Sequence, residues 1–133
     1  FPRGGPGAET LSPRSCAVVI IDFGETVFKQ DRHNGHIGTR QYRAPEVLLG
    51  CRWDEKIDLW GAACVLVKLY TGTCPFSIVR SNMEHLALIE RVVGCELPKA
   101  LVLDAFAGRG LPEDVVFDVN ERLTWPAGAD AGA

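Results

Sequence analysis

The order of apolar and polar residues predicts a mainly α-helical chain with one short β segment. Ala17-Val18-Val19-Ile20-Ile21 is a β-branched run that stops at Asp22-Phe23-Gly24, a pattern typical of a buried strand followed by a turn. Pro45 favours the first turn of a short helix that ends at Gly50. A long helix is expected over 55–70. Because the middle of that helix is apolar on every side, we expect it at the centre of a larger body.

Two further helices follow. Ser81-Asn82-Met83-Glu84 is a capping box, in which the Ser81 hydroxyl can accept a hydrogen bond from the Glu84 amide. The helix that it begins has one apolar face and should end at Gly94, the residue type preferred after a last helical turn. Residues 99–107 form a weaker helical segment, which Gly108-Arg109-Gly110 interrupts.

The distribution of proline and glycine predicts three regions. Residues 1–16 are rich in both and are expected to be a loop or a disordered lead-in. Residues 17–126 are expected to form the folded part, and residues 127–133 a flexible Ala/Gly-rich tail. The chain does not begin with Met, which suggests a piece of a longer protein.

Composition narrows the class of protein. With 133 residues, and 14 Lys and Arg against 17 Asp and Glu, the chain has the size of one domain and no excess of positive charge. We therefore expect no direct binding to nucleic acid or to a membrane surface. No apolar run approaches the ~18 residues that span a bilayer. The five cysteines form no C-x-x-C pair, which is typical of buried thiols in a reducing, intracellular compartment.

Asp22 is the first candidate for chemistry. A carboxylate at the end of a strand, followed by Phe23 and the flexible Gly24, can point into a cleft and bind a hard cation such as Mg²⁺ together with phosphate oxygens. Taken alone, Asp-x-Gly after a strand is more often a simple turn, and that alternative stays open on these residues.

A second cluster changes the interpretation. Gly38-Thr39-Arg40-Gln41-Tyr42-Arg43-Ala44-Pro45-Glu46 follows a short loop, and Asp58 and Trp60 lie further on. The D-F-G of residues 22–24, the A-P-E of residues 44–46 and the D-x-W of residues 58–60 resemble, in this order, the protein kinase superfamily. The longer T-R-x-Y-R-A-P-E is similar to the group of cyclin-dependent, MAP and CDC-like kinases.

The helix that begins at Ser81 narrows the resemblance. Residues 84–94 read E-H-L-A-L-I-E-R-V-V-G and resemble the E-H-L-A-M-M-E-R-I-L-G signature of LAMMER kinases, a family of CDC-like kinases. The resemblance covers roughly residues 16–126 and implies a partial C-terminal lobe of the protein kinase-like fold. The same residues also satisfy the pattern of an amphipathic helix, so a purely structural role for them stays open.

The resemblance implies a role for each matched residue. Asp22 would bind Mg²⁺ on the phosphates of ATP, Phe23 would pack under the cleft, and Gly24 would let the segment pivot. Position 25 is Glu where the LAMMER pattern has Ser, and this second carboxylate either affects Mg²⁺ and ATP or faces solvent.

The other matched residues would serve the protein substrate and the scaffold. Thr39 would contact the catalytic aspartate and lysine, and Tyr42 and Arg43 would shape the floor under the substrate. Glu46 would pair with an arginine. Arg122 is conceivable as that partner, although it aligns better with the R-L-x-W-P segment that follows the LAMMER signature, since Trp125 and Pro126 then also match. Asp58 would anchor the catalytic loop.

The implied function is that of a serine/threonine or dual-specificity protein kinase. Its substrates would be proteins, serine/arginine-rich splicing factors among them, in the nucleus or the cytoplasm. The 133 residues contain no H-x-D-x-x-x-x-N catalytic loop, so the general-base Asp is not among them and we expect no kinase activity from this chain alone. The alternative is a non-catalytic, pseudokinase-like module for protein interactions.

Overall fold

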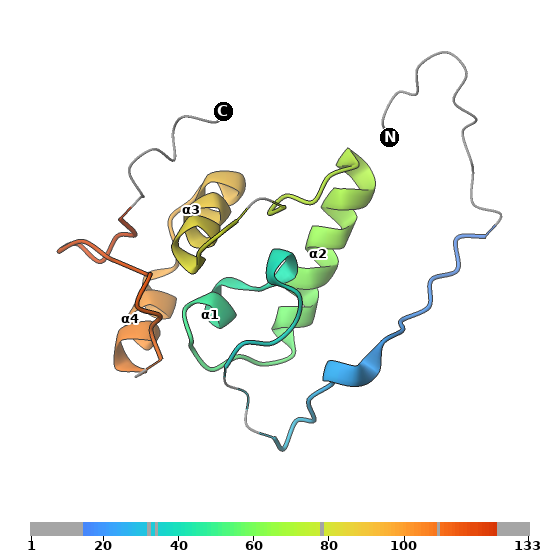
Figure 1. Cartoon of the computed structure of the whole chain (residues 1–133), viewed down its shortest axis with the longest axis horizontal. Helices are drawn as coiled ribbons and strands as arrows, with labels where there is room; N and C mark the ends of the chain where they lie inside the picture. The colour runs from blue at the N-terminus through green and yellow to red at the C-terminus, as the bar shows by residue number, and fades with distance from the viewer. Residues whose placement is uncertain (1–14, 32, 34, 78, 109, 125–133) are drawn as a thin grey trace, which may run out of the picture.

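The computed structural model describes residues 15–31, 33, 35–77, 79–108 and 110–124. Over these residues the chain is mostly helical (Figure 1). Two 3-10 turns, η1 (Phe23–Glu25) and η2 (Arg40–Tyr42), precede four α-helices: α1 (Pro45–Leu48), α2 (Lys56–Thr71), α3 (Asn82–Val93) and α4 (Lys99–Ala107). The β structure in the described part is one isolated antiparallel bridge between Phe117 and Leu123. Residues 1–14 of the predicted lead-in, which was expected over 1–16, and the predicted tail over 127–133 lie outside the described residues.

The helix ends follow the local signals in the sequence. The Ser81 hydroxyl accepts from the Glu84 amide at 3.0 Å, and α3 ends with Gly94 in the left-handed conformation (φ 78°). In turn, the Glu84 carboxylate accepts from the Arg80 amide at 2.7 Å. Gly72, with φ 82°, ends α2 in the same way. These caps satisfy backbone groups that a helix end leaves without a partner, so the elements start and stop where the sequence predicts.

The core lies where α1 packs against α3, with η2 against α2 and with α4 and the bridge region beyond (Figure 1). Leu48, Leu49 and Leu86 are fully buried at its centre. The buried apolar residues of this cluster are Leu48, Leu49, Cys51, Cys64, Phe76, Met83, Leu86, Ala87, Ile89, Leu97, Val102, Ala105, Val115 and Leu123. A smaller cluster of Ala44, Val47 and Trp53 covers the side of α1 that faces the preceding loop.

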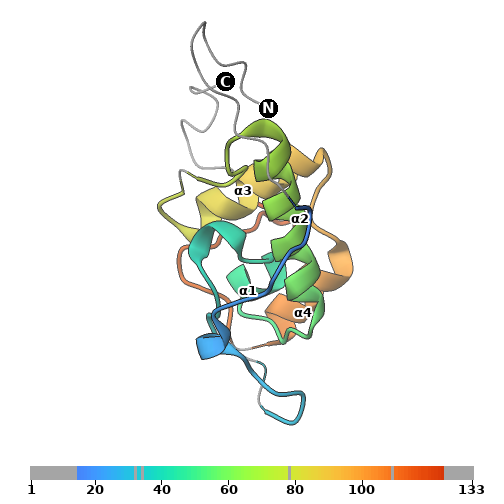
Figure 2. The same cartoon turned by 90° about the vertical axis from the view of Figure 1, so that its right-hand side faces the viewer.

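The predicted strand over 17–21 is wrong. These residues form no regular structure, and Val18 is 90% exposed. The physical reason is that a strand needs a neighbour to satisfy its backbone groups, and the described residues provide none beside this run. Figures 1 and 2 place residues 15–31 on the outer side of α2, apart from the helical body.

Helix α2 was expected at the centre of a larger body, and the described residues cover only part of it. Cys64 is its buried residue, while Leu59, Leu66 and Leu69 are each about two-thirds exposed or more. The exposed flank is apolar rather than polar. A helix with that surface can be fully buried only in a body larger than the one described.

Candidate functional site

Asp22 occupies a strained turn. It precedes η1 with φ 66° and ψ 63°, in the left-handed region that few residues other than Gly adopt, although Asp and Asn tolerate it best. Its Oδ1 lies 3.7 Å from the place where a side chain on Gly24 would begin. Strain of this kind costs on the order of 1–3 kcal/mol and is found most often at functional sites.

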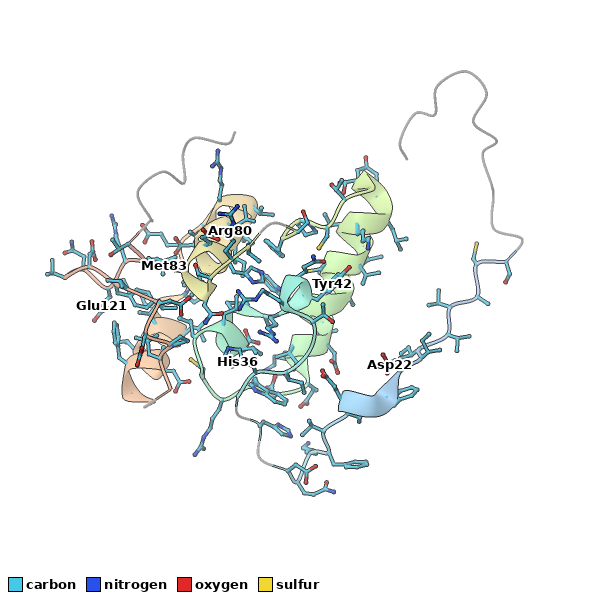
Figure 3. The ribbon with its side chains drawn as sticks, in the orientation of Figure 1. Asp22, His36, Tyr42, Arg80, Met83 and Glu121 are labelled. Carbon is cyan, nitrogen blue, oxygen red and sulfur yellow. The ribbon has the colours of Figure 1, made fainter. Side chains whose placement is uncertain are left out.

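The surroundings of Asp22 are open. Figure 3 shows Asp22 on the segment outside the helical body, whereas Tyr42 lies beside α2. Phe23 is 67% exposed, so its ring does not pack under a cleft as the resemblance implied. Among the described residues, no group of three His, Cys, Asp or Glu side chains is placed to hold a metal ion. Mg²⁺ on a nucleotide needs one or two protein carboxylates besides phosphate oxygens, and Asp22 fits as one such ligand.

Glu25 is exposed, and its Oε2 accepts a hydrogen bond from the Gly38 amide at 3.1 Å. Arg43 reaches the same place, because its Nε donates to the carbonyl oxygens of Ile37 at 3.2 Å and Gly38 at 3.0 Å. The end of the D-F-G turn is thereby tied to the residues that precede the A-P-E helix.

The residues before α1 rest on α2. Thr39 is exposed and precedes η2 as its N-cap residue. Tyr42 is half-buried against the core, and its hydroxyl lies 3.4 Å from the Nζ of Lys68 on α2. Cys74 donates its thiol hydrogen to the carbonyl of Gln41 at 3.8 Å. These contacts hold 39–43 against the helical body.

The expected anchors have other surroundings than the resemblance implied. Glu46 lies in the first turn of α1 and is half-buried. Arg122, its conceivable partner, instead pairs with Glu96, with Nε and Oε1 3.3 Å apart. Asp58 lies in the first turn of α2 and is exposed.

A buried histidine, His85, lies near Arg40 and Arg43 and was not identified from the sequence. His85 is 0% exposed, and neither of its ring nitrogens has a hydrogen-bond partner among the described residues. Burial and the nearby charges of Arg40 and Arg43 lower the pKa of His85 to about 4. Its ring lies 5.2 Å from that of Phe76, which in turn stacks on Trp60. The E-H-L-A motif marked this histidine, but only the fold shows that it is enclosed.

A second contact without a sequence signal holds the start of α3. The Asp114 carboxylate accepts from the Asn82 amide at 2.7 Å and from the Asn82 side chain at 3.2 Å. The two residues are 32 positions apart, so no local pattern indicated the pair. A negative charge at this end also favours the helix dipole.

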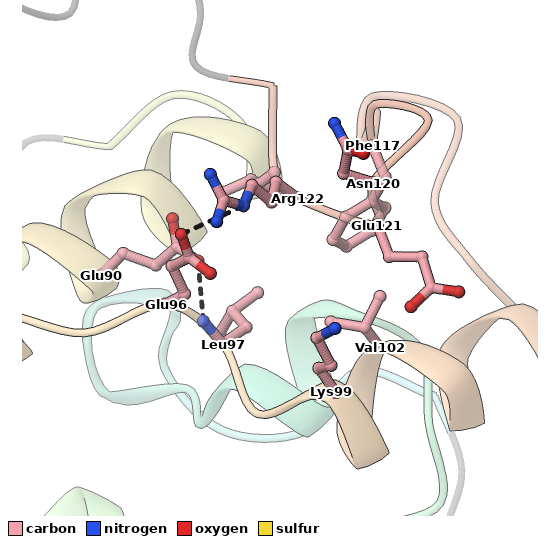
Figure 4. Close-up of a pocket in the computed structure, with 10 residues that line it drawn as sticks. Glu90, Glu96, Leu97, Lys99, Val102, Phe117, Asn120, Glu121 and Arg122 are labelled. Atoms are coloured by element: carbon pink, nitrogen blue, oxygen red, sulfur yellow. Dashed lines mark hydrogen bonds and ion pairs between the residues drawn. The ribbon is translucent and has the colours of Figure 1, made fainter.

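The hollows of the described surface lie away from Asp22. One, of about 350 Å³, lies between α3, α4 and the bridge region. Figure 4 shows the Glu90 carboxylate in it, which accepts from the Leu97 amide at 2.7 Å, and the pair of Arg122 with Glu96. These side chains already bind one another, so we assign the hollow a structural role. A wider hollow lies beside Cys51 and Gly50.

Comparisons with known proteins identify the class. The protein kinase domain family matches residues 11–105. The chain is 44% identical over 117 residues to the serine/threonine-protein kinase AFC1 of Arabidopsis thaliana, covering 88% of this chain and 24% of that protein. It is 40% identical over 121 residues to the human dual specificity protein kinase CLK2, covering 91% of this chain and 22% of the other. A crystal structure of a kinase domain superposes with a TM-score of 0.72 at 42% identity, covering 83% of this chain and 31% of that one.

The chain therefore belongs to the protein kinase family. Within it, the chain is of the LAMMER, or CDC-like, type and forms part of a C-terminal lobe, as the motifs predicted. It spans about a quarter of the length of the curated relatives described above. Within the part of the chain that the structure describes, no helix is long and apolar enough to cross a bilayer.

Proposed function

We propose that the protein carrying this chain is a serine/threonine or dual-specificity protein kinase that transfers the terminal phosphoryl group of ATP to hydroxyl groups of proteins. The observation that supports it most is the order of motifs within one kinase-family match: the D-F-G at 22–24, the T-R-x-Y-R-A-P-E at 39–46 and the D-x-W at 58–60.

In this proposal ATP supplies the phosphoryl group, and Mg²⁺ would neutralise the charge of that group during transfer. Asp22 would hold the metal ion. Arg43 fixes the backbone of 37–38, and Tyr42 rests against α2, so together they would form the floor under the protein substrate. Asp58, which is exposed at the start of α2, is free to anchor the catalytic loop.

The finer assignment rests on the LAMMER resemblance. Serine/arginine-rich splicing factors are the proposed substrates, and the nucleus, with or without the cytoplasm, is the proposed location. The relatives carry the names of serine/threonine and dual specificity kinases, which supports hydroxyl groups of proteins as acceptors. Specificity beyond that is a property of the whole protein.

The second candidate is a non-catalytic module for protein interactions. It is favoured by the exposed apolar flank of α2. The transcript upstream of Phe1 separates the two. An intact catalytic loop and a lysine-bearing strand support the kinase, and degraded versions of these motifs support the module.

The activity itself is tested on the full-length protein that carries this chain, with ATP, Mg²⁺ and a serine/arginine-rich peptide. Asp22→Asn is expected to lower kcat/KM by on the order of 100-fold or more, because it weakens the hold on the metal ion that neutralises the transition-state charge. Glu113→Gln, an exposed change of the same kind, is the matched control and should leave kcat/KM unchanged. Equal activity of Asp22→Asn and wild type, or no transfer by the wild type, would overturn the proposal. The 133-residue chain by itself is expected to show no turnover.

A further inference from the structure

Gly38 is held from two directions by charged side chains. Its amide donates to Oε2 of Glu25 at 3.1 Å, and its carbonyl accepts from Nε of Arg43 at 3.0 Å. Glu25 comes directly after the D-F-G triplet, and Arg43 directly before the A-P-E triplet. The two hydrogen bonds therefore join the two ends of the loop between these motifs through one residue.

The negative charge of Glu25 and the positive charge of Arg40 both act on Arg43. Arg40 and Arg43 belong to the same short stretch, and Arg43 is partly buried. Its pKa is lowered by burial and by the charge of Arg40, and the charge of Glu25 acts in the opposite direction. Glu25 thus offsets part of the repulsion between the two arginines and favours the charged form of Arg43 at this position.

The far part of the loop is held separately. Nε1 of Trp53 donates to the carbonyl of Gly35 at 3.1 Å, and the His33 ring stacks on Trp53 with centroids 4.9 Å apart and planes 4° from parallel. His33 Nε2 also lies 3.0 Å from the carbonyl oxygen of Phe28. Trp53 therefore holds the middle of the loop, whereas the contact of Glu25 holds the end of the loop next to the D-F-G triplet.

We infer that Glu25 is a positioning residue, which fastens the D-F-G turn to Gly38, the residue that Arg43 also holds, and so places Asp22 relative to the substrate-binding residues. The catalytic meaning of this inference rests on the proposed function, but the contact itself does not. A serine, the residue of the LAMMER pattern at position 25, is shorter by two carbon atoms and carries no charge. It could neither reach the Gly38 amide in this backbone conformation nor offset the charge of Arg40.

The test is hydrogen exchange, followed by mass spectrometry of a peptide that contains the Gly38 amide, in the absence of nucleotide. Glu25→Ser removes both the acceptor and the charge, and Glu25→Gln keeps an acceptor oxygen but removes the charge. Glu113→Ser is the matched control at an exposed site. Each protein is measured at low and at high salt, because salt screens the attraction between Glu25 and Arg43 but not a neutral hydrogen bond.

Exchange at Gly38 is expected to be about tenfold faster in Glu25→Ser, as for loss of one hydrogen bond to a charged acceptor. The exchange rate at Gly38 in Glu25→Gln should lie between the rates in Glu25→Ser and in wild type. The rate in wild type should depend on salt, whereas the rate in Glu25→Gln should not. Unchanged exchange in Glu25→Ser, or an equal change in Glu113→Ser, would overturn the inference. Since no nucleotide is present, the exchange experiment does not depend on kinase activity. A failure of the proposed kinase activity is therefore distinguishable from a failure of the Glu25 contact.

Discussion

Replacing His85 by leucine should remove a large part of the acid sensitivity of this fold. His85 is fully buried on α3, and both of its ring nitrogens lack a partner among the described residues. The charged groups that act on it, Arg40 and Arg43, are both positive. Protonation of His85 in the folded chain would therefore bury a third positive charge without compensation.

The sign and the size follow from the pKa of His85. It is lowered from 6.5 to about 4 in the folded chain, so between these values the unfolded chain binds a proton that the folded chain does not. The contribution of neutral His85 to the free energy of unfolding is fully present above pH 6.5 and is lost as the pH falls towards 4. With 1.36 kcal/mol for each pKa unit, the loss attributable to His85 is about 3 kcal/mol.

The assay is urea-induced unfolding, followed by tryptophan fluorescence from pH 7.5 to pH 4.5. His85→Leu should be at least as stable as wild type at pH 7.5, because the nitrogens it loses have no partner. Its advantage over wild type should then grow as the pH falls, while the carboxylates common to both proteins cancel in the difference. His36→Leu is the control, since His36 is exposed and its removal should leave the pH dependence as in wild type. A difference between His85→Leu and wild type that stays constant over this range would refute the reasoning.

Two further predictions concern backbone space and a long-range cap. A side chain on Gly50, which has φ 70°, would overlap the carbonyl oxygen of Gly110, so Gly50→Ala should lower the free energy of unfolding by about 3 kcal/mol. Gly35→Ala, at φ 80° but in open space, should lower it by about 1 kcal/mol in the same urea titration, and equal losses would contradict the role of Gly110. Asp114→Ala should cost about 1.5 kcal/mol by leaving the Asn82 amide without its acceptor, and Asp114→Asn should cost less; thermal melts with equal midpoints for all three proteins would show that this contact contributes nothing.

Local patterns were sufficient for the helices and for the family. The ends of α3 depend on Ser81 and Gly94, whose preferences act within one turn of the chain and are legible without a partner segment. The motifs around Asp22 and Glu46 were legible for a similar reason, because each is a short run of residues in a set order. A kinase lobe could therefore be predicted before any contact was known.

The tertiary structure decided everything that depends on a distant neighbour. The run at 17–21 has the composition of a strand, but strand formation requires a second strand, and the described residues place none beside it. The histidine of the E-H-L-A motif looks like any helical polar residue until Arg40 and Arg43 are placed beside it. Glu25 likewise had two possible roles until the fold placed the Gly38 amide within its reach. Propensity acts along the chain, whereas burial, charge and pairing depend on which distant segments meet.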